Sequence, residues 1–356
     1  MKTITKTVPL IISLGLACLS RAQSYAVVDL GPTSWAYAAS GERAFGFTGS
    51  GASIRATMWD STGAQTDVHP SFLDGATPGF SMIRGAGGTY WVGYGSGQPT
   101  GGRPMPILWE NGVARLLPVG FASINGTANA TDGTQVVGYA YASELVRDVA
   151  TFGDAHAVLW TPSTGEFVDL YRGNPTYANG VGGGKQVGYE LRGNRYEAQL
   201  WSGTARSAIN LHPRNFDVSM ANATDGVRQV GQVGVDTPYP GEHKRGRKVR
   251  FNYAYVWNGT AESGQMLGSF FAESYALGVA GDTIAGYCVR NDIWGRDLDQ
   301  VATAWVGPLN ELVDLGTFLP SGSSHSRALA VDAAGNVTGS ALYPDGQVHG
   351  VLWVRL

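Results

Sequence analysis

The sequence predicts an all-β protein, a seven-bladed β-propeller, from three observations. Glycine is abundant (51 of 356 residues) and charged residues are sparse (15%), as expected of short strands joined by tight turns. A glycine-anchored pattern recurs seven times at intervals of 43 to 55 residues, the length of one four-stranded blade. Residues 25–31 ("YAVVDLG") match a fourth strand that the last repeat lacks, so they are expected to complete that blade. A linear β-solenoid is the alternative, and it would not need this closure.

The N-terminal segment has the layout of a secretory signal peptide over residues 1–22. Lys2 and Lys6 precede an apolar run from residue 8 to 19, and small residues occupy positions 20 and 22. Residues 23–356 are expected to form the single propeller domain, secreted or periplasmic. Only Cys288 remains after cleavage, so burial rather than a disulfide must hold the fold together.

The mature chain is mildly acidic, because 28 Asp and Glu oppose 25 Lys and Arg and three of those basic residues belong to the leader. This balance argues against nucleic acid as a partner. No segment after the leader is long and apolar enough to cross a membrane. We expect a monomer without a membrane span.

Four strands, called A to D, are expected in each repeat. Strand A precedes a tight turn such as Asp-Gly, strand B is of the "QVVGY" type, strand C ends in an apolar residue and tryptophan, and strand D is of the "FVDLY" type. The strand-B glycines that anchor the repeat are Gly46, Gly93, Gly138, Gly188, Gly231, Gly286 and Gly339. The strand-C tryptophans are Trp59, Trp109, Trp160, Trp201, Trp257, Trp305 and Trp353.

The repeat resembles the extracellular HAF repeat, named for its His-Ala-Phe triplet. The resemblance covers almost the whole mature chain and is clearest in "ANATDGTQVVGYAY" and the following "DAHAVLWTPSTGEFVDL". Only "HAV" at 156–158 and "HGV" at 349–351 keep the histidine, and none keeps the phenylalanine. The resemblance implies a secreted, propeller-like repeat protein and no catalytic residues.

Connection lengths point to one face of the ring as the binding face. In an antiparallel blade, the B–C and D–A connections lie on one face and the A–B and C–D connections on the other. The spacing from the strand-B glycine to the strand-C tryptophan varies from 13 to 26 residues and is longest in the third, fifth and sixth repeats. Insertions on one face of a repeat protein favour a binding role for it.

Arginine and aromatic residues gather in the B–C connections of the fourth, fifth and sixth repeats. Arginine forks pair with carboxylates and sulfates, and aromatic faces pack on sugar rings. The sequence therefore predicts binding of an acidic polysaccharide or another extracellular polyanion. The candidate ligand-binding residues are Arg192, Arg195, Tyr196, Tyr239, His243, Lys244, Arg245, Arg247, Arg290, Trp294 and Arg296.

Two other functions stay open at this stage. One is a polysaccharide lyase or hydrolase acting on uronate-containing glycans, with His212, His325 and Tyr189 as candidate acid and base and arginine neutralising the uronate. The other is a scaffold for protein interactions. No HExxH, Walker A, GxSxG or CxxC motif and no calcium-loop spacing occurs, so we expect no metal and no cofactor.

Overall fold

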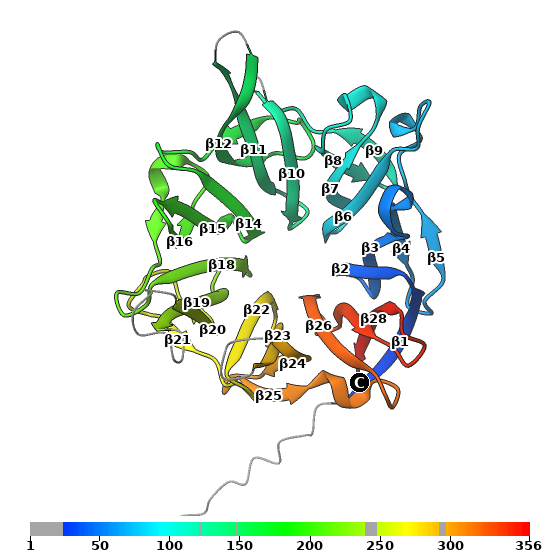
Figure 1. The fold of residues 1–356 in the computed structure, drawn as a ribbon, viewed down its shortest axis with the longest axis vertical. Coiled ribbons are helices and arrows are strands. Elements are labelled where there is room, and N and C mark those ends of the chain that lie inside the picture. The colour runs from blue at the N-terminus through cyan, green and yellow to red at the C-terminus, as the bar shows by residue number, and fades with distance from the viewer. Residues whose placement is uncertain (1–23, 121–122, 147–148, 239–247, 292–296) are drawn as a thin grey trace, which may run out of the picture.

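The computed structural model describes residues 24–356, apart from 121–122, 147–148, 239–247 and 292–296. Its strands form seven four-stranded antiparallel sheets arranged around a central axis, which confirms the seven-bladed propeller (Figure 1). The predicted signal peptide, residues 1–22, lies outside the described residues.

The four strands of each blade follow the expected order from the axis outward. The innermost A strands are β2 (Ser34–Ser40), β6 (Phe80–Gly87), β10 (Ser123–Thr131), β14 (Thr176–Gly182), β18 (Val218–Thr224), β22 (Glu273–Ala280) and β26 (Ser324–Val331). The B strands are β3 (Arg43–Thr48), β7 (Tyr90–Ser96), β11 (Val136–Val146), β15 (Lys185–Arg192), β19 (Gln229–Pro238), β23 (Thr283–Asn291) and β27 (Val337–Leu342).

The outer half of each blade consists of a C strand and a shorter D strand. The C strands are β4 (Arg55–Trp59), β8 (Met105–Glu110), β12 (Val149–Trp160), β16 (Arg195–Trp201), β20 (Lys248–Trp257), β24 (Asp297–Val306) and β28 (Val348–Arg355). The D strands are β5 (Gln65–Asp67), β9 (Val113–Leu116), β13 (Phe167–Asp169), β17 (Ile209–Asn210), β21 (Gln265–Met266), β25 (Glu311–Asp314) and β1 (Tyr25–Pro32). Short 3-10 helices occur in the connections: η1 (Gly51–Ser53), η2 (Ser71–Leu73), η3 (Gln98–Thr100), η4 (Ala205–Ser207) and η5 (Leu315–Phe318).

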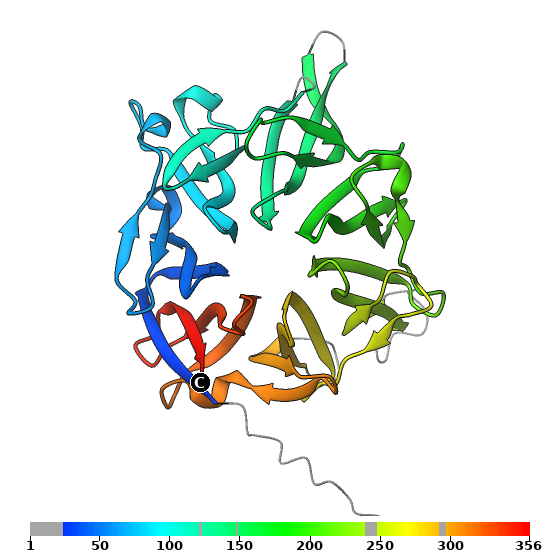
Figure 2. The ribbon, with the colours of Figure 1, turned by 180° about the vertical axis from the view of Figure 1, so that it is seen from behind.

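The ring is closed by its first strand. β1 pairs antiparallel with β28, with Tyr25 opposite Arg355 and Val28 opposite Leu352. In Figure 2 the C-terminus lies beside this strand. His349 of β28 also bonds the Asp29 carboxylate of β1, with Nδ1 and Oδ1 2.8 Å apart. The prediction that residues 25–31 complete the last blade is confirmed.

We call the side that carries the B–C and D–A connections the loop face, and the side that carries the A–B and C–D connections the turn face. The hairpin of β11 and β12 projects beyond its neighbours (Figure 1). It accounts for the extra residues expected in the third B–C connection.

The hydrophobic core lies between blades rather than within one. One cluster joins Val137 and Ala157 of the third blade to Ala178 and Trp201 of the fourth. All seven strand-C tryptophans are at most 1% exposed. Several also donate an indole hydrogen bond to the D–A connection that leaves the preceding blade, as from Trp160 to the Pro118 carbonyl (2.7 Å).

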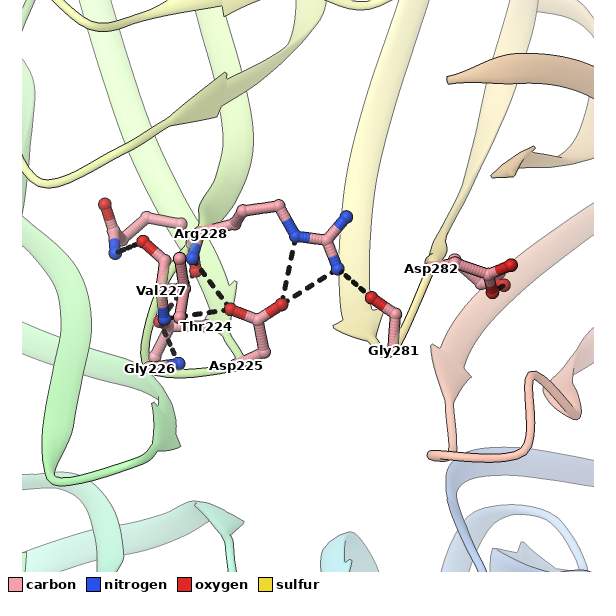
Figure 3. Close-up of polar contacts among 9 residues, drawn as sticks. Thr224, Asp225, Gly226, Val227, Arg228, Gly281 and Asp282 are labelled. Atoms are coloured by element: carbon pink, nitrogen blue, oxygen red, sulfur yellow. Dashed lines mark hydrogen bonds and ion pairs between the residues drawn. The ribbon is translucent and has the colours of Figure 1, made fainter. Parts of the chain in front are cut away.

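Turn-face contacts link neighbouring blades as well. In the turn after β18, the Asp225 carboxylate accepts the backbone N–H of Val227 (3.0 Å) and pairs with the Arg228 guanidinium (2.8 Å). The same guanidinium donates to the Gly281 carbonyl in the next blade (2.6 Å), as Figure 3 shows. Each "ANATDG" segment thus ends an A strand and begins the A–B turn, as the repeat predicts.

Candidate functional site at the central channel

Every A strand carries a β-bulge at the same position. The bulge inserts one residue that has no partner on the B strand, where the pairing register shifts. These seven residues all line a central channel of about 1060 Å³. In blade order they are Tyr37, Arg84, Asn129, Asn179, Asn222, Leu277 and Leu329.

The bulge explains why the repeat is anchored on glycine. A Cβ atom on Gly188 would lie 1.8 Å from the Tyr177 carbonyl oxygen, and one on Gly138 would lie 1.9 Å from that of Thr127. The other five anchors show the same approach, at 1.8 to 1.9 Å. Such distances exclude any side chain, so the glycines are required by the bulges that line the channel.

Three consecutive blades share an asparagine at the bulge. The amide nitrogen of Asn129 donates to the Ala178 carbonyl (2.9 Å), that of Asn179 to Ala221 (3.0 Å), and that of Asn222 to Ala276 (2.9 Å). Each bond crosses from one blade to the next, so these amides tie blades three to six together at the axis. The series stops in the sixth blade because leucine replaces asparagine at its bulge.

A continuous group of tyrosine rings lies beside this channel, and we call it the tyrosine run. The ring centroids of Tyr177 and Tyr189 are 4.7 Å apart and the rings stack. Tyr139 meets Tyr177 edge-on at 4.9 Å, and also contacts Tyr141 at 5.7 Å. Tyr196 meets Tyr189 edge-on at 5.5 Å. The five rings come from β11, β14, β15 and β16, and each remains partly exposed.

The hydroxyls of Tyr139, Tyr177 and Tyr189 stay neutral in the physiological pH range. Burial raises the pKa of Tyr139, Tyr177 and Tyr189 above the ordinary value of 10.0. For Tyr177, a hydrogen bond with Tyr141 acts in the same direction. Neutral phenols both donate and accept hydrogen bonds. The run therefore offers apolar ring faces together with polar hydroxyl groups.

Two arginines lie over other tyrosine rings near the axis, and neither has a carboxylate partner among the described residues. Arg84 stacks over the Tyr37 ring at 4.4 Å, and Arg327 lies over Tyr287 at 5.2 Å and bonds the Gln300 side chain. The Arg84 charge also acts on Tyr139, where it opposes the larger effect of burial on the pKa. Arg84 and Tyr189 of the tyrosine run line the same channel.

The predicted histidine His212 is held by an inter-blade hydrogen bond. Its Nδ1 lies 2.8 Å from the Ser219 hydroxyl oxygen, which also accepts the backbone N–H of Ala198 in the preceding blade (2.9 Å). His69 and Ser81 form the same arrangement one half-ring away. Burial lowers the pKa of His212 below its ordinary value, so its imidazole is neutral at pH 7.

The other two predicted catalytic residues lie in different surroundings. His325 lies within β26, exposed, with Nδ1 3.2 Å from the Ser324 hydroxyl. Tyr189 belongs to the tyrosine run. In the part of the chain that the structure describes, no hydrogen bond, ion pair or ring contact joins any two of His212, His325 and Tyr189.

The predicted ligand-binding residues fall into three groups. Arg192, Arg195 and Tyr196 surround the tight turn between β15 and β16 on the loop face, and Arg192 pairs there with Glu190 (3.2 Å). Arg290 stacks over the Phe271 ring at 4.7 Å. The remaining seven lie outside the described residues: Tyr239, His243, Lys244, Arg245, Arg247, Trp294 and Arg296.

The described residues contain neither a candidate metal site nor a candidate membrane-spanning helix. No three or more His, Cys, Asp or Glu side chains within the described ranges are grouped so that they could hold a metal ion. No helix in the same part of the chain has the length and apolar character needed to cross a membrane.

The sequence alone does not identify the seven bulge residues, nor Tyr141 and Tyr177, two of the five members of the tyrosine run. A signal for three of the bulge residues is the second residue of "ANAT" in two repeats and the matching "AN" at 178–179. This asparagine is hard to distinguish from a turn residue in the sequence, because asparagine favours turns and the A–B turn follows closely.

Neither a family model nor a curated protein sequence matches the chain. Solved structures share its fold at low identity. A puromycin-hydrolyzing peptidase from Mycobacterium tuberculosis is 14% identical with a TM-score of 0.57, and the match covers 91% of this chain and 52% of the peptidase. An oligogalacturonate lyase in complex with manganese is 10% identical with a TM-score of 0.50, over 93% of this chain and 96% of the lyase. TolB from Acinetobacter baumannii is 11% identical with a TM-score of 0.43, over 93% of this chain and 63% of TolB. The likenesses to the peptidase and to the lyase show the propeller fold alone.

Proposed function

We propose that this propeller binds an acidic polysaccharide outside the cytoplasm, with the tyrosine run as the platform for the sugar chain. The observation that supports the proposal is the run itself: five partly exposed tyrosines from two blades in unbroken ring contact. A closed apolar core has no need of so many phenol groups. The resemblance to secreted HAF repeats and the leader-like N-terminus agree with an extracytoplasmic location.

The chemistry of the run suits a sugar chain. Pyranose rings present C–H faces that pack on aromatic rings, and their hydroxyls exchange hydrogen bonds with neutral phenols. Arg84 and Arg327 add positive charge that no described carboxylate neutralises. Guanidinium groups bind carboxylates bidentately, which favours uronate residues over neutral sugars. Arg192 is less available because Glu190 and Glu197 already pair with it.

Polygalacturonate is the first polymer to test, since a structure with a similar fold is named as an oligogalacturonate lyase. Binding is measured by affinity electrophoresis in gels containing the polymer, at low and at high salt. We expect retardation by wild-type protein that weakens with salt, because screening reduces charge attraction. Y189A and Y196A should each lose most of this retardation.

Tyr90 supplies the matched control. It is also partly buried, but it begins β7 at the turn face, where its hydroxyl bonds Glu110 (3.2 Å). Y90A should bind the polymer as wild type does. If Y189A and Y196A bind normally, or if Y90A is equally impaired, the tyrosine run is not the platform.

The same reagents test the two other functions. A lyase would release unsaturated sugars that absorb in the ultraviolet, and loss of this activity in H212A or H325A would assign the residue. Binding is favoured over catalysis because His212 already bonds Ser219 and no described contact unites it with Tyr189. A protein scaffold would show no retardation by any polyanion, and its binding to a protein partner would survive high salt.

A further inference from the structure

The central channel differs around its circumference in a way that the fold does not require. The bulge residues of blades one to five are polar, Tyr37, Arg84 and three asparagines, whereas those of blades six and seven are Leu277 and Leu329. All seven positions accept the bulge equally well, so closure of the ring does not explain this asymmetry. A channel with one polar arc and one apolar arc is suited to a ligand with two different sides.

The polar arc offers unused hydrogen-bond acceptors. The amide nitrogens of Asn179 and Asn222 are committed to the neighbouring blade. Their Oδ1 atoms accept no hydrogen bond from the described residues, although both side chains line the channel. Because each amide is pinned by its nitrogen, its oxygen is an oriented acceptor. Oriented acceptors of this kind favour the hydroxyl groups of a ligand.

Arg84 supplies the charge in the same arc. Its Cζ lies 4.4 Å from the centroid of the Tyr37 ring, a cation–π contact that helps to position the guanidinium, and it has no described carboxylate partner. The opposite, turn-face end of the channel carries Asp132 and Asp332, together with Asp225, whose charge is paired with Arg228. An anionic group would be repelled at that end and attracted at Arg84. Tyr189 belongs both to the channel lining and to the tyrosine run, so the two are continuous.

We propose that the channel receives the end of a uronate chain from the loop face, with Arg84 pairing with a carboxylate and Asn179 and Asn222 accepting hydroxyl hydrogen bonds. This deepens the proposed function and rests on it for the class of ligand. The volume of about 1060 Å³ slightly exceeds the roughly 300–1000 Å³ typical of small-molecule sites. A few sugar units fit within it.

The test uses saturated trigalacturonate, measured by isothermal titration calorimetry on the full-length protein. We expect R84Q to weaken binding at least about tenfold, because a charge-assisted pair is lost. R84K should fall between R84Q and wild type, since lysine keeps the charge but not the fork. R43Q, which changes an exposed arginine on the turn face, should bind as wild type does. Thermal unfolding of R84Q and R84K establishes that each variant is folded.

The outcomes separate the channel from the platform. Equal trigalacturonate affinity for wild type and R84Q overturns the channel site, as does equal affinity for a neutral galactose trisaccharide. Retardation by polygalacturonate that depends on Tyr196, which belongs to the tyrosine run and is not a channel-lining residue, would then still support the platform. If polymer retardation does not depend on Tyr196 while trigalacturonate binding requires Arg84, the platform fails and the channel site stands.

Discussion

The seven equivalent tryptophans allow a comparison within one molecule, by changing Trp160 and Trp257 separately to phenylalanine. Both side chains are fully buried at the end of a C strand. The Trp160 indole donates to the Pro118 carbonyl at 2.7 Å, whereas the Trp257 indole N–H is buried with no acceptor among the described residues. The two substitutions therefore remove the same atoms from similar sites but differ in one hydrogen bond.

The expected difference follows from that hydrogen bond. The cavity costs of the two substitutions cancel to first order. W160F loses a bond with a net contribution of about 1 kcal/mol, while W257F removes an unsatisfied buried donor whose burial costs about 1–3 kcal/mol. We expect W160F to be less stable than W257F by about 2–4 kcal/mol. With an unfolding entropy of about 2.1 cal/mol/K per residue, this corresponds to a Tm difference of about 3–6 °C.

Differential scanning calorimetry of the two variants checks this expectation. Two further variants serve as replicates: W305F should resemble W160F, because Trp305 donates to the Gly268 carbonyl at 2.7 Å, and W59F should resemble W257F. Equal Tm losses at all four sites would show that the indole bonds do not contribute to stability. A lower Tm for W257F than for W160F would refute the reasoning.

Two further predictions concern the bulge and the ring closure. G188A should prevent folding or lower the Tm by many degrees, because its Cβ would lie 1.8 Å from a backbone oxygen. G193A lies at a turn with open space and should lower the free energy of unfolding by only about 1–2 kcal/mol, because alanine is strained in the left-handed backbone conformation. Similar urea midpoints for the two variants would contradict the bulge argument. His349 is the second case: burial lowers its pKa, but its bonds to Asp29 and Asp345 outweigh burial and hold the pKa above 6.5. Its stabilising effect is full below about pH 6.5 and is lost as pH rises through the raised pKa. H349Q should therefore lower the Tm most under acidic conditions, and a Tm loss that does not change with pH would oppose this account.

The fold was predictable because its determinants are local and repeated. Gly138 and Trp160 recur at fixed spacing in every blade, and the match between residues 25–31 and the other D strands revealed the closure. The bulge that makes Gly138 obligatory was not predictable, because it depends on how an A strand bends at the axis. The sequence shows that Gly138 recurs, but it does not show that the Thr127 carbonyl oxygen lies where a side chain would be.

The candidate site was harder to predict, since its residues come from different blades and are brought together only when the blades pack side by side. Tyr139 and Tyr177 lie 38 positions apart in different blades, and neither position stands out as unusual in its own repeat. The most charged loops are the most conspicuous candidates in the sequence, and most of their candidate residues lie outside the described part of the chain. His212 was a reasonable candidate by residue type, but its bond to Ser219 is set by a neighbouring blade.

The pairing of β1 with β28 also has a consequence for how the chain folds. His349 and Asp29 are separated by 320 positions, so their contact has nearly the largest loop-closure cost in the molecule. During synthesis, β1 emerges before the other strands and stays unpaired until β28 has been made, while the seventh blade keeps an open edge. Unpaired strands and open edges are sites where chains exchange strands or aggregate. The step most exposed to misassembly is therefore the last one, when the two ends of the ring meet.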